Sequence, residues 1–91
     1  MIQALTIQEL KLRLSQPVFI VESQNRDIKP CWNRVSWVSL DEIGFEDGFI
    51  TVVSLFEEGA TRAYDRELTE EELVEVYRET DLRISELYRN C

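Results

Sequence analysis

The sequence contains no histidine among its 91 residues. This absence excludes Ser-His and Cys-His nucleophile pairs and removes the commonest general base and metal ligand. Its three glycines are too few and too scattered to form a phosphate-binding loop. Paired carboxylates such as Asp41 and Glu42 remain, but adjacent residues of a strand point to opposite faces. We therefore expect no enzymatic activity, no bound metal and no cofactor.

Cationic residues are also scarce. Ten Lys and Arg stand against 18 Asp and Glu, which gives a formal net charge of −8. This balance argues against nucleic acids and anionic membranes as direct partners, because affinity for phosphates comes largely from Lys and Arg. No apolar run approaches the roughly 18 residues that span a bilayer, and the N-terminus lacks the pattern of a signal peptide. Cys31 and Cys91 have neither disulfide-framework nor zinc-ligand spacing, so we expect two reduced thiols in a cytoplasmic protein.

The clearest positive signal is a helix-start pattern that occurs twice, at Leu5–Leu10 and at Leu68–Leu73. In each copy a Thr can cap the backbone N–H three residues on, the Glu at that position can reach back, and the flanking Leu pair can form a hydrophobic staple. Hydrophobic residues make up 44% of the chain, enough for a core in one domain spanning residues 1–91. The sequence therefore predicts two helices that enclose the rest of the chain.

The first helix is predicted from Thr6 to about Ser15, because Pro17 disfavours helical geometry before it. The segment after it has the pattern of a sheet. Four strands are expected, at Val18–Val21 as the innermost strand, Arg34–Leu40 with an extension toward Phe45, Phe49–Phe56, and Thr61–Tyr64.

Two turn signals and one long connection separate these strands. Asp47-Gly48 predicts a hairpin between the second and third strands, which we expect to be long and central, and Glu57-Glu58-Gly59 predicts a second turn. The polar segment Ser23–Asn33 is a connection of about ten residues. It is either a plain hairpin connection or a binding loop.

The second helix is predicted to run unbroken from its Thr69 cap to about Asn90. Advancing 100° per residue gathers a core-facing stripe on one face, made up of Leu73, Val76, Tyr77, Thr80, Ile84, Leu87 and Tyr88. The opposite face carries the carboxylates of Glu71, Glu75, Glu79 and Glu86, of which those four residues apart lie about 6 Å apart along the axis. This face is either a solvated surface or a contact for a basic groove on another protein, as in a nucleic-acid mimic.

Leu82 falls on the acidic side of this helix. A kink near Thr80 and Asp81, plain exposure and an interface all remain open for it. Among the aromatic residues, we expect Trp37, Phe49 and Phe56 to be inside. Trp32, which lies beside Arg34 at the end of the long connection, is either a partly exposed interface anchor or packed over a helix end.

These patterns predict a two-layer α+β fold: an antiparallel meander of three or four strands with an N-terminal and a C-terminal helix packed on one face. The function that we expect is a non-enzymatic protein-interaction module. Its contacts would come from Trp32, Arg34, Glu71, Glu75, Glu79 and Leu82. The alternative is an acidic nucleic-acid mimic that inhibits a DNA- or RNA-binding protein, such as a mobile genetic element could encode. A homodimer is also left open by the sequence.

Overall fold

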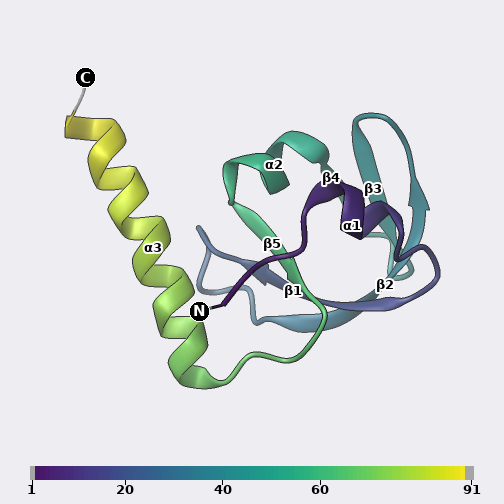
Figure 1. Cartoon of the computed structure of the whole chain (residues 1–91), viewed down its shortest axis with the longest axis horizontal. Coiled ribbons are helices and arrows are strands. Elements are labelled where there is room, and N and C mark those ends of the chain that lie inside the picture. The colour runs from purple at the N-terminus through teal and green to yellow at the C-terminus, as the bar shows by residue number, and fades with distance from the viewer. Residues whose placement is uncertain (1, 90–91) are drawn as a thin grey trace.

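The computed structural model describes residues 2–89, with side chains described for residues 2–56 and 59–83. Five antiparallel strands form one sheet in the order β4-β3-β2-β1-β5. The helices and strands follow one another along the chain (Figure 1) as α1 (Ile7–Lys11), β1 (Pro17–Glu22), β2 (Cys31–Val38), β3 (Glu42–Phe45), β4 (Ile50–Val52), α2 (Val53–Glu58), β5 (Thr61–Tyr64) and α3 (Glu70–Arg89). The predicted α+β class, the antiparallel meander and the two terminal helices are confirmed. The sheet has one strand more than the four expected, because the strand predicted from Arg34 toward Phe45 is divided into β2 and β3. The last strand, β5, pairs with β1.

Both helix starts are confirmed. The Thr6 hydroxyl accepts from the Glu9 backbone N–H, and the Glu9 carboxylate accepts from the Thr6 N–H at 3.0 Å. Thr69 and Glu72 form the same reciprocal pair before α3, at 3.2 and 2.9 Å. Each of these reciprocal pairs, known as a capping box, satisfies two backbone N–H donors that a helix start otherwise leaves free.

The first helix is shorter than the predicted span from Thr6 to Ser15. It ends at Lys11, a turn follows, and Ser15 takes a φ of 68°. The helix cannot continue because the next residues bind to the sheet: the Ser15 N–H donates to the Val35 carbonyl at 2.7 Å. The chain must therefore turn before Pro17 opens β1, which leaves the Leu12 and Leu14 side chains exposed.

Two predicted strands are also wrong in extent. A turn at residues 39–41 separates β2 from β3, where the Ser39 N–H donates to the Glu42 carbonyl and the Ser39 hydroxyl accepts from the Glu42 N–H. The strand predicted at Phe49–Phe56 ends at Val52, and α2 takes its second half. No side chain caps the start of α2, whereas Gly59 closes its end with a left-handed φ of 81°.

The Asp47-Gly48 hairpin is confirmed, but it joins the short strands β3 and β4 at one edge of the sheet. Gly48 supplies the positive φ, at 93°, that this turn needs. The strand in the middle of the sheet order is β2. The predicted innermost strand, β1, lies next to it and pairs on both sides, and its residues Val18–Val21 are all buried.

The two faces of β1 pack against different helices, so the expectation that both terminal helices share one face is wrong. Val18 and Ile20 lie in a core cluster with Leu10 of α1, and residues of α2 pack against it. Phe19 and Val21, which alternate with them, lie in a second cluster with Val76 of α3. We call these two sides of the sheet the α1 face and the α3 face.

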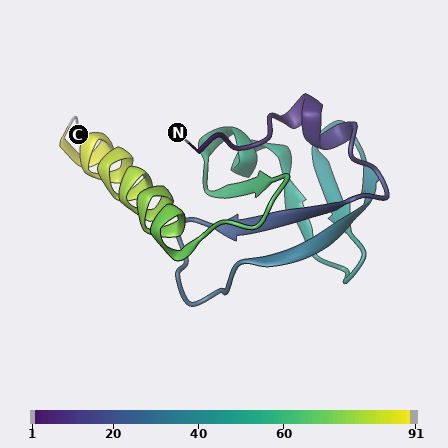
Figure 2. The same cartoon turned by 60° about the horizontal axis from the view of Figure 1, so that its bottom comes forward.

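The first part of α3 packs against the sheet through Leu73, Val76 and Tyr77. The helix then leads away from the sheet (Figures 1 and 2). The predicted core stripe is confirmed for Leu73, Val76, Tyr77 and Thr80, which are buried or half-buried. The side chains of Ile84, Leu87 and Tyr88 lie outside the described residues, as does that of Glu86. No helix in residues 2–89 is long and apolar enough to cross a membrane.

Replacing Glu72 by glutamine is expected to flatten the loss of stability in acid. Its hydrogen bond with Arg66, and then that with the Thr69 backbone, lower the pKa of Glu72 from 4.5 to about 2. In the unfolded chain the carboxylate takes up a proton near its ordinary pKa, so its stabilising contribution is complete above about pH 5 and is lost as the pH falls toward 2.

Urea unfolding midpoints of the wild type and Glu72→Gln at several pH values between about 2 and 7 check this expectation. The unfolding midpoints of the two proteins should be similar at low pH and should differ above pH 4. Because the pair is exposed to solvent, added salt should narrow the difference. Glu71→Gln, next in the chain and without an ion pair among the described residues, is the control. Equal pH dependence in all three proteins would contradict the assignment.

Candidate protein-binding surface

An irregularity in β2 places both tryptophans on the α3 face. Trp32 pairs with Phe19 and lies on the α3 face, whereas Val35 points into the core of the α1 face. The register shifts between Val35 and Trp37, and Val38 again packs against the α1-face core. This β-bulge adds one residue, so Trp37 points outward. The expectation that Trp37 lies inside, which assumed strict alternation, is therefore wrong.

Trp32 is 46% exposed, and its ring meets the buried Phe19 edge to face, with ring centres 5.6 Å apart and planes at 66°. The indole is thus partly exposed, as one of the two predictions had it. The aromatic contact restricts the indole while leaving much of its surface accessible. A large, ordered, amphipathic side chain of this kind loses little entropy on binding.

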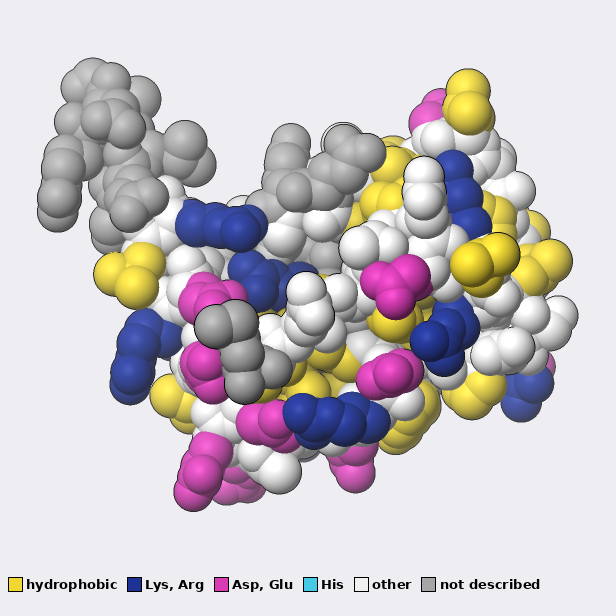
Figure 3. All heavy atoms as spheres, viewed as in Figure 1, with side chains coloured by type: hydrophobic (Ala, Val, Ile, Leu, Met, Phe, Trp, Pro, Cys, Tyr) yellow, Lys and Arg dark blue, Asp and Glu magenta, His cyan; other side chains and the backbone are white. Residues whose placement is uncertain are grey.

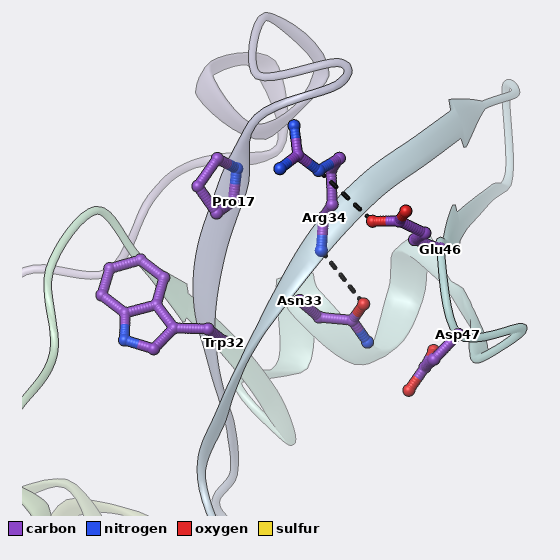
Figure 4. A pocket seen from close by; sticks show the side chains of 6 residues that line it. All are labelled: Pro17, Trp32, Asn33, Arg34, Glu46 and Asp47. Carbon is purple, nitrogen blue, oxygen red and sulfur yellow. Dashed lines mark hydrogen bonds and ion pairs between the residues drawn. The ribbon is translucent and has the colours of Figure 1, made fainter.

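The indole borders a shallow hollow of about 360 Å³ that Pro17, Trp32, Asn33, Arg34, Glu46 and Asp47 line. Figure 4 shows Pro17 between the indole and the Arg34 side chain, with Glu46 and Asp47 on the far side. The hollow thus has an aromatic wall at one end and carboxylates at the other. It brings together residues of β1, β2 and the hairpin that joins β3 to β4.

Arg34 does not project freely, although the sequence predicts it as a contact residue. Its Nη1 donates to the Ser15 carbonyl at 2.9 Å, and its Nε lies 3.3 Å from the Glu46 carboxylate. These two contacts hold the guanidinium along the wall of the hollow. The ion pair also neutralises Glu46 in part, so most of the negative charge that remains at this end is that of Asp47.

Asp47 has a fixed, ionised carboxylate. The side-chain amide of Asn33, and then the Phe49 N–H, which donates at 2.9 Å, hold the pKa of Asp47 below its ordinary value. No Lys or Arg of the described part of the chain forms an ion pair with it. Sequence analysis identified Asp47 only as a turn residue. Its closeness to Asn33 depends on the pairing of β2 with β3, which no local pattern reveals.

The predicted contact residues of α3 lie apart from this hollow, since none of the described side chains of that helix lines it. Glu71 and Glu75 are exposed. Glu79, by contrast, forms an ion pair at 3.0 Å with Arg62 of β5, whose side chain is almost fully buried. Over the start of α3, basic side chains lie among the acidic ones (Figure 3). The structure therefore does not join the six predicted residues into one site.

Leu82 is 59% exposed on α3. The helix is continuous from Glu70 to Arg89, and Thr80 donates its hydroxyl to the Val76 carbonyl at 3.2 Å within it. No new helical segment therefore begins at Thr80 or Asp81, and the interpretation of Leu82 by a kink is wrong. Exposure is confirmed, and an interface at Leu82 stays a prediction.

The long connection, which the structure places at residues 23–30, contacts α3 through the side chain of Arg26. The Arg26 guanidinium lies 4.9 Å from the centre of the Tyr77 ring and forms an ion pair with Asp81. The same group donates to the Tyr77 carbonyl at 3.4 Å. A cation over an aromatic face that also meets a carboxylate favours one position of the connection over many.

Other surface features offer less. Phe49, expected inside, is exposed and stacks on Phe45 with ring centres 5.7 Å apart; it lies in the hairpin just before the edge strand β4. Phe56 is half-buried against the α1-face core. Cys31 is a free, exposed thiol, and Cys91 lies outside the described residues. In the described part of the chain, no group of three or more Cys, Asp or Glu is placed to hold a metal ion.

Comparison of the chain with protein-family models, with curated proteins and with solved structures found no match, so the function must be argued from the residues and geometry above.

Proposed function

We propose that this chain is a non-enzymatic protein-interaction module that binds a partner protein in the cytoplasm through the surface around Trp32. The observation that carries the proposal is an exposed indole, held by Phe19, at the edge of a hollow that also contains a fixed carboxylate. Trp beside charged groups is the composition typical of the residues that dominate binding energy at protein interfaces.

The charge of the molecule supports a partner with a basic surface. The net charge is −8, and the carboxylates of Glu46 and Asp47 meet only one guanidinium in the hollow, that of Arg34. A surface of this sign repels nucleic acids and anionic membranes and attracts a positively charged protein. We therefore do not propose direct binding to nucleic acid or membrane.

The α3 surface supports the alternative, an acidic nucleic-acid mimic, less well. Its argument depends on a regular row of free carboxylates, whereas Glu79, a member of that row, is paired with Arg62. Exposed Glu71 and Glu75, together with Leu82, remain as a second contact area for the same partner. If the mimic is correct, Glu71→Gln with Glu75→Gln would abolish binding and Trp32→Ala would not.

Replacing Trp32 by alanine is expected to weaken binding of the partner at least about tenfold, because truncating a central interface aromatic typically costs more than 1.4 kcal/mol. Quantitative capture from an extract of the source cells, with the immobilised wild type and variant side by side, checks this. Leu40→Ala is the control, since Leu40 is also apolar and is 90% exposed on the turn at residues 39–41.

The informative result is a protein that the wild type and Leu40→Ala capture and Trp32→Ala loses. Circular dichroism must show that Trp32→Ala is folded, and Trp32→Phe should restore part of the binding. Sedimentation of the wild type and Trp32→Ala tests whether that partner is a second copy of the chain. The same set of proteins captured by all the variants would rule the proposal out.

A further inference from the structure

A second hollow lies next to the Trp32 hollow, on the other side of Asn33 and Asp47. It encloses about 200 Å³, and its apolar walls come from Ile20 and Phe49 on the sheet and Ile28 on the connection between β1 and β2. Ile28 and Phe49 are exposed, whereas Ile20 belongs to the buried α1-face core. The hollow is thus an opening in the side of the hydrophobic core.

The two hollows share two residues. Asn33 and Asp47 line both of them, so the pair forms a ridge with the Trp32 hollow on one side and the apolar hollow on the other. A binding segment that crosses the ridge meets a fixed negative charge in the middle. An indole then lies on one side of that charge, and aliphatic and aromatic carbon lies on the other.

The charges around the ridge favour a cation at its centre. Arg34 and Glu46 form an ion pair with each other on the Trp32 side. On the apolar side Glu22 and Lys29 carry opposite charges, and the Thr61 hydroxyl donates one hydrogen bond that the two Glu22 oxygens share, at 3.2 and 3.1 Å. These pairs roughly cancel, which leaves the Asp47 carboxylate as the uncompensated group.

Building on the proposed function, we infer that the partner presents an extended segment in which an arginine contacts Asp47 and Trp32 while a neighbouring apolar residue enters the hollow between Ile28 and Phe49. A guanidinium can make both contacts at once, because it stacks on an indole face and its planar fork of N–H groups donates to a carboxylate. The apolar residue gains by leaving water, and Leu, Ile or Phe would suit the walls. The ligand class is therefore a basic and apolar peptide motif.

Short peptides of defined sequence test this inference. Each is an acetylated and amidated glycine peptide with one Arg and one Leu, separated by none, one, two or three glycines. Matched peptides carry Gln for Arg or Ser for Leu. Titration into the full chain, followed by the backbone N–H signals of Asn33, Asp47 and Phe49 and by the Trp32 indole N–H, measures affinity and location together.

We expect one spacing to bind at least about fivefold more tightly than either of its matched peptides. Asp47→Asn should remove the preference for Arg, and it keeps the hairpin because Asn-Gly suits the same turn. Ile28→Ser should remove the preference for Leu and leave that for Arg. Asp65→Asn, an exposed acidic residue that lines neither hollow, should change neither preference.

The inference is overturned if no spacing binds more tightly than its matched peptides, or if Asp47→Asn keeps the preference for Arg. Neither result touches the proposed function, which depends on the loss of a captured protein in Trp32→Ala. Conversely, failure of that capture experiment leaves the peptide result to be judged on its own signals.

Discussion

Replacing Leu10 by alanine is expected to lower the free energy of unfolding by about 3 kcal/mol. Leu10 is fully buried and joins α1 to the core of the α1 face, where it meets residues such as Val18 and Val35. Its helix has five residues, far too few to be stable alone, so packing of this side chain must hold it in place. Truncation leaves a cavity that the surrounding sheet can close only in part.

The same segment offers a matched control. Leu12, two residues on, is 81% exposed, so Leu12→Ala should change the free energy of unfolding by less than about 0.5 kcal/mol. Urea unfolding followed by circular dichroism measures both variants. The free energy of unfolding of a domain of this size is about 5 kcal/mol, and Leu10→Ala therefore lies near the limit of folding at 37 °C. Similar effects of the two variants would show that α1 does not pack as described.

Replacing Gly44 by alanine is expected to cost about 2 kcal/mol, through a single steric conflict. Gly44 pairs with Trp37 across β2 and β3, and a Cβ built on it would lie 2.1 Å from atoms of the indole ring. The ring therefore lies flat on the glycine, and a methyl group must push it off the sheet into water. Trp37 is 38% exposed, so the ring can move away, which limits the cost.

A double-mutant cycle isolates this conflict. In the Trp37→Ala background, Gly44→Ala should be neutral or slightly stabilising, because alanine is less flexible than glycine in the unfolded chain. Urea unfolding gives the four free energies, and a red shift of tryptophan emission should accompany Gly44→Ala alone. An equal cost of Gly44→Ala in both backgrounds would mean that the backbone itself, and not the indole, demands glycine at this position.

Local patterns were enough to predict the parts of the fold that local chemistry determines. Thr6 with Glu9, and Thr69 with Glu72, each place a capping side chain within three residues of the group it satisfies, so both helix starts could be predicted. The Asp47-Gly48 turn is equally local. The start of α2 has no side-chain cap, and the branched side chain of Val53 favours a strand, so this helix could not be found.

The errors at the candidate site have a different origin. A bulge changes which face a residue occupies, and nothing in the run from Val35 to Val38 marks the extra residue. Long-range ion pairs cannot be predicted from local sequence for a related reason. Arg62 and Glu79, for example, are brought together by the packing of α3 against β5. Partial exposure of Trp32 was one of the two alternatives that the sequence left open. The residues that line the hollow come from three separate segments, so finding them needed the register of the sheet.

The bond between Arg26 and α3 gives the helix an influence beyond the residues it covers. Asp81 and Tyr77 hold Arg26, and the connection that carries Arg26 also carries Ile28, a wall of the apolar hollow. A shift of α3 is therefore expected to displace Ile28, and a ligand bound in the apolar hollow is expected to stabilise the position of α3. Through Asp81 and Arg26, the part of α3 that leads away from the sheet is thus linked to a wall of the apolar hollow.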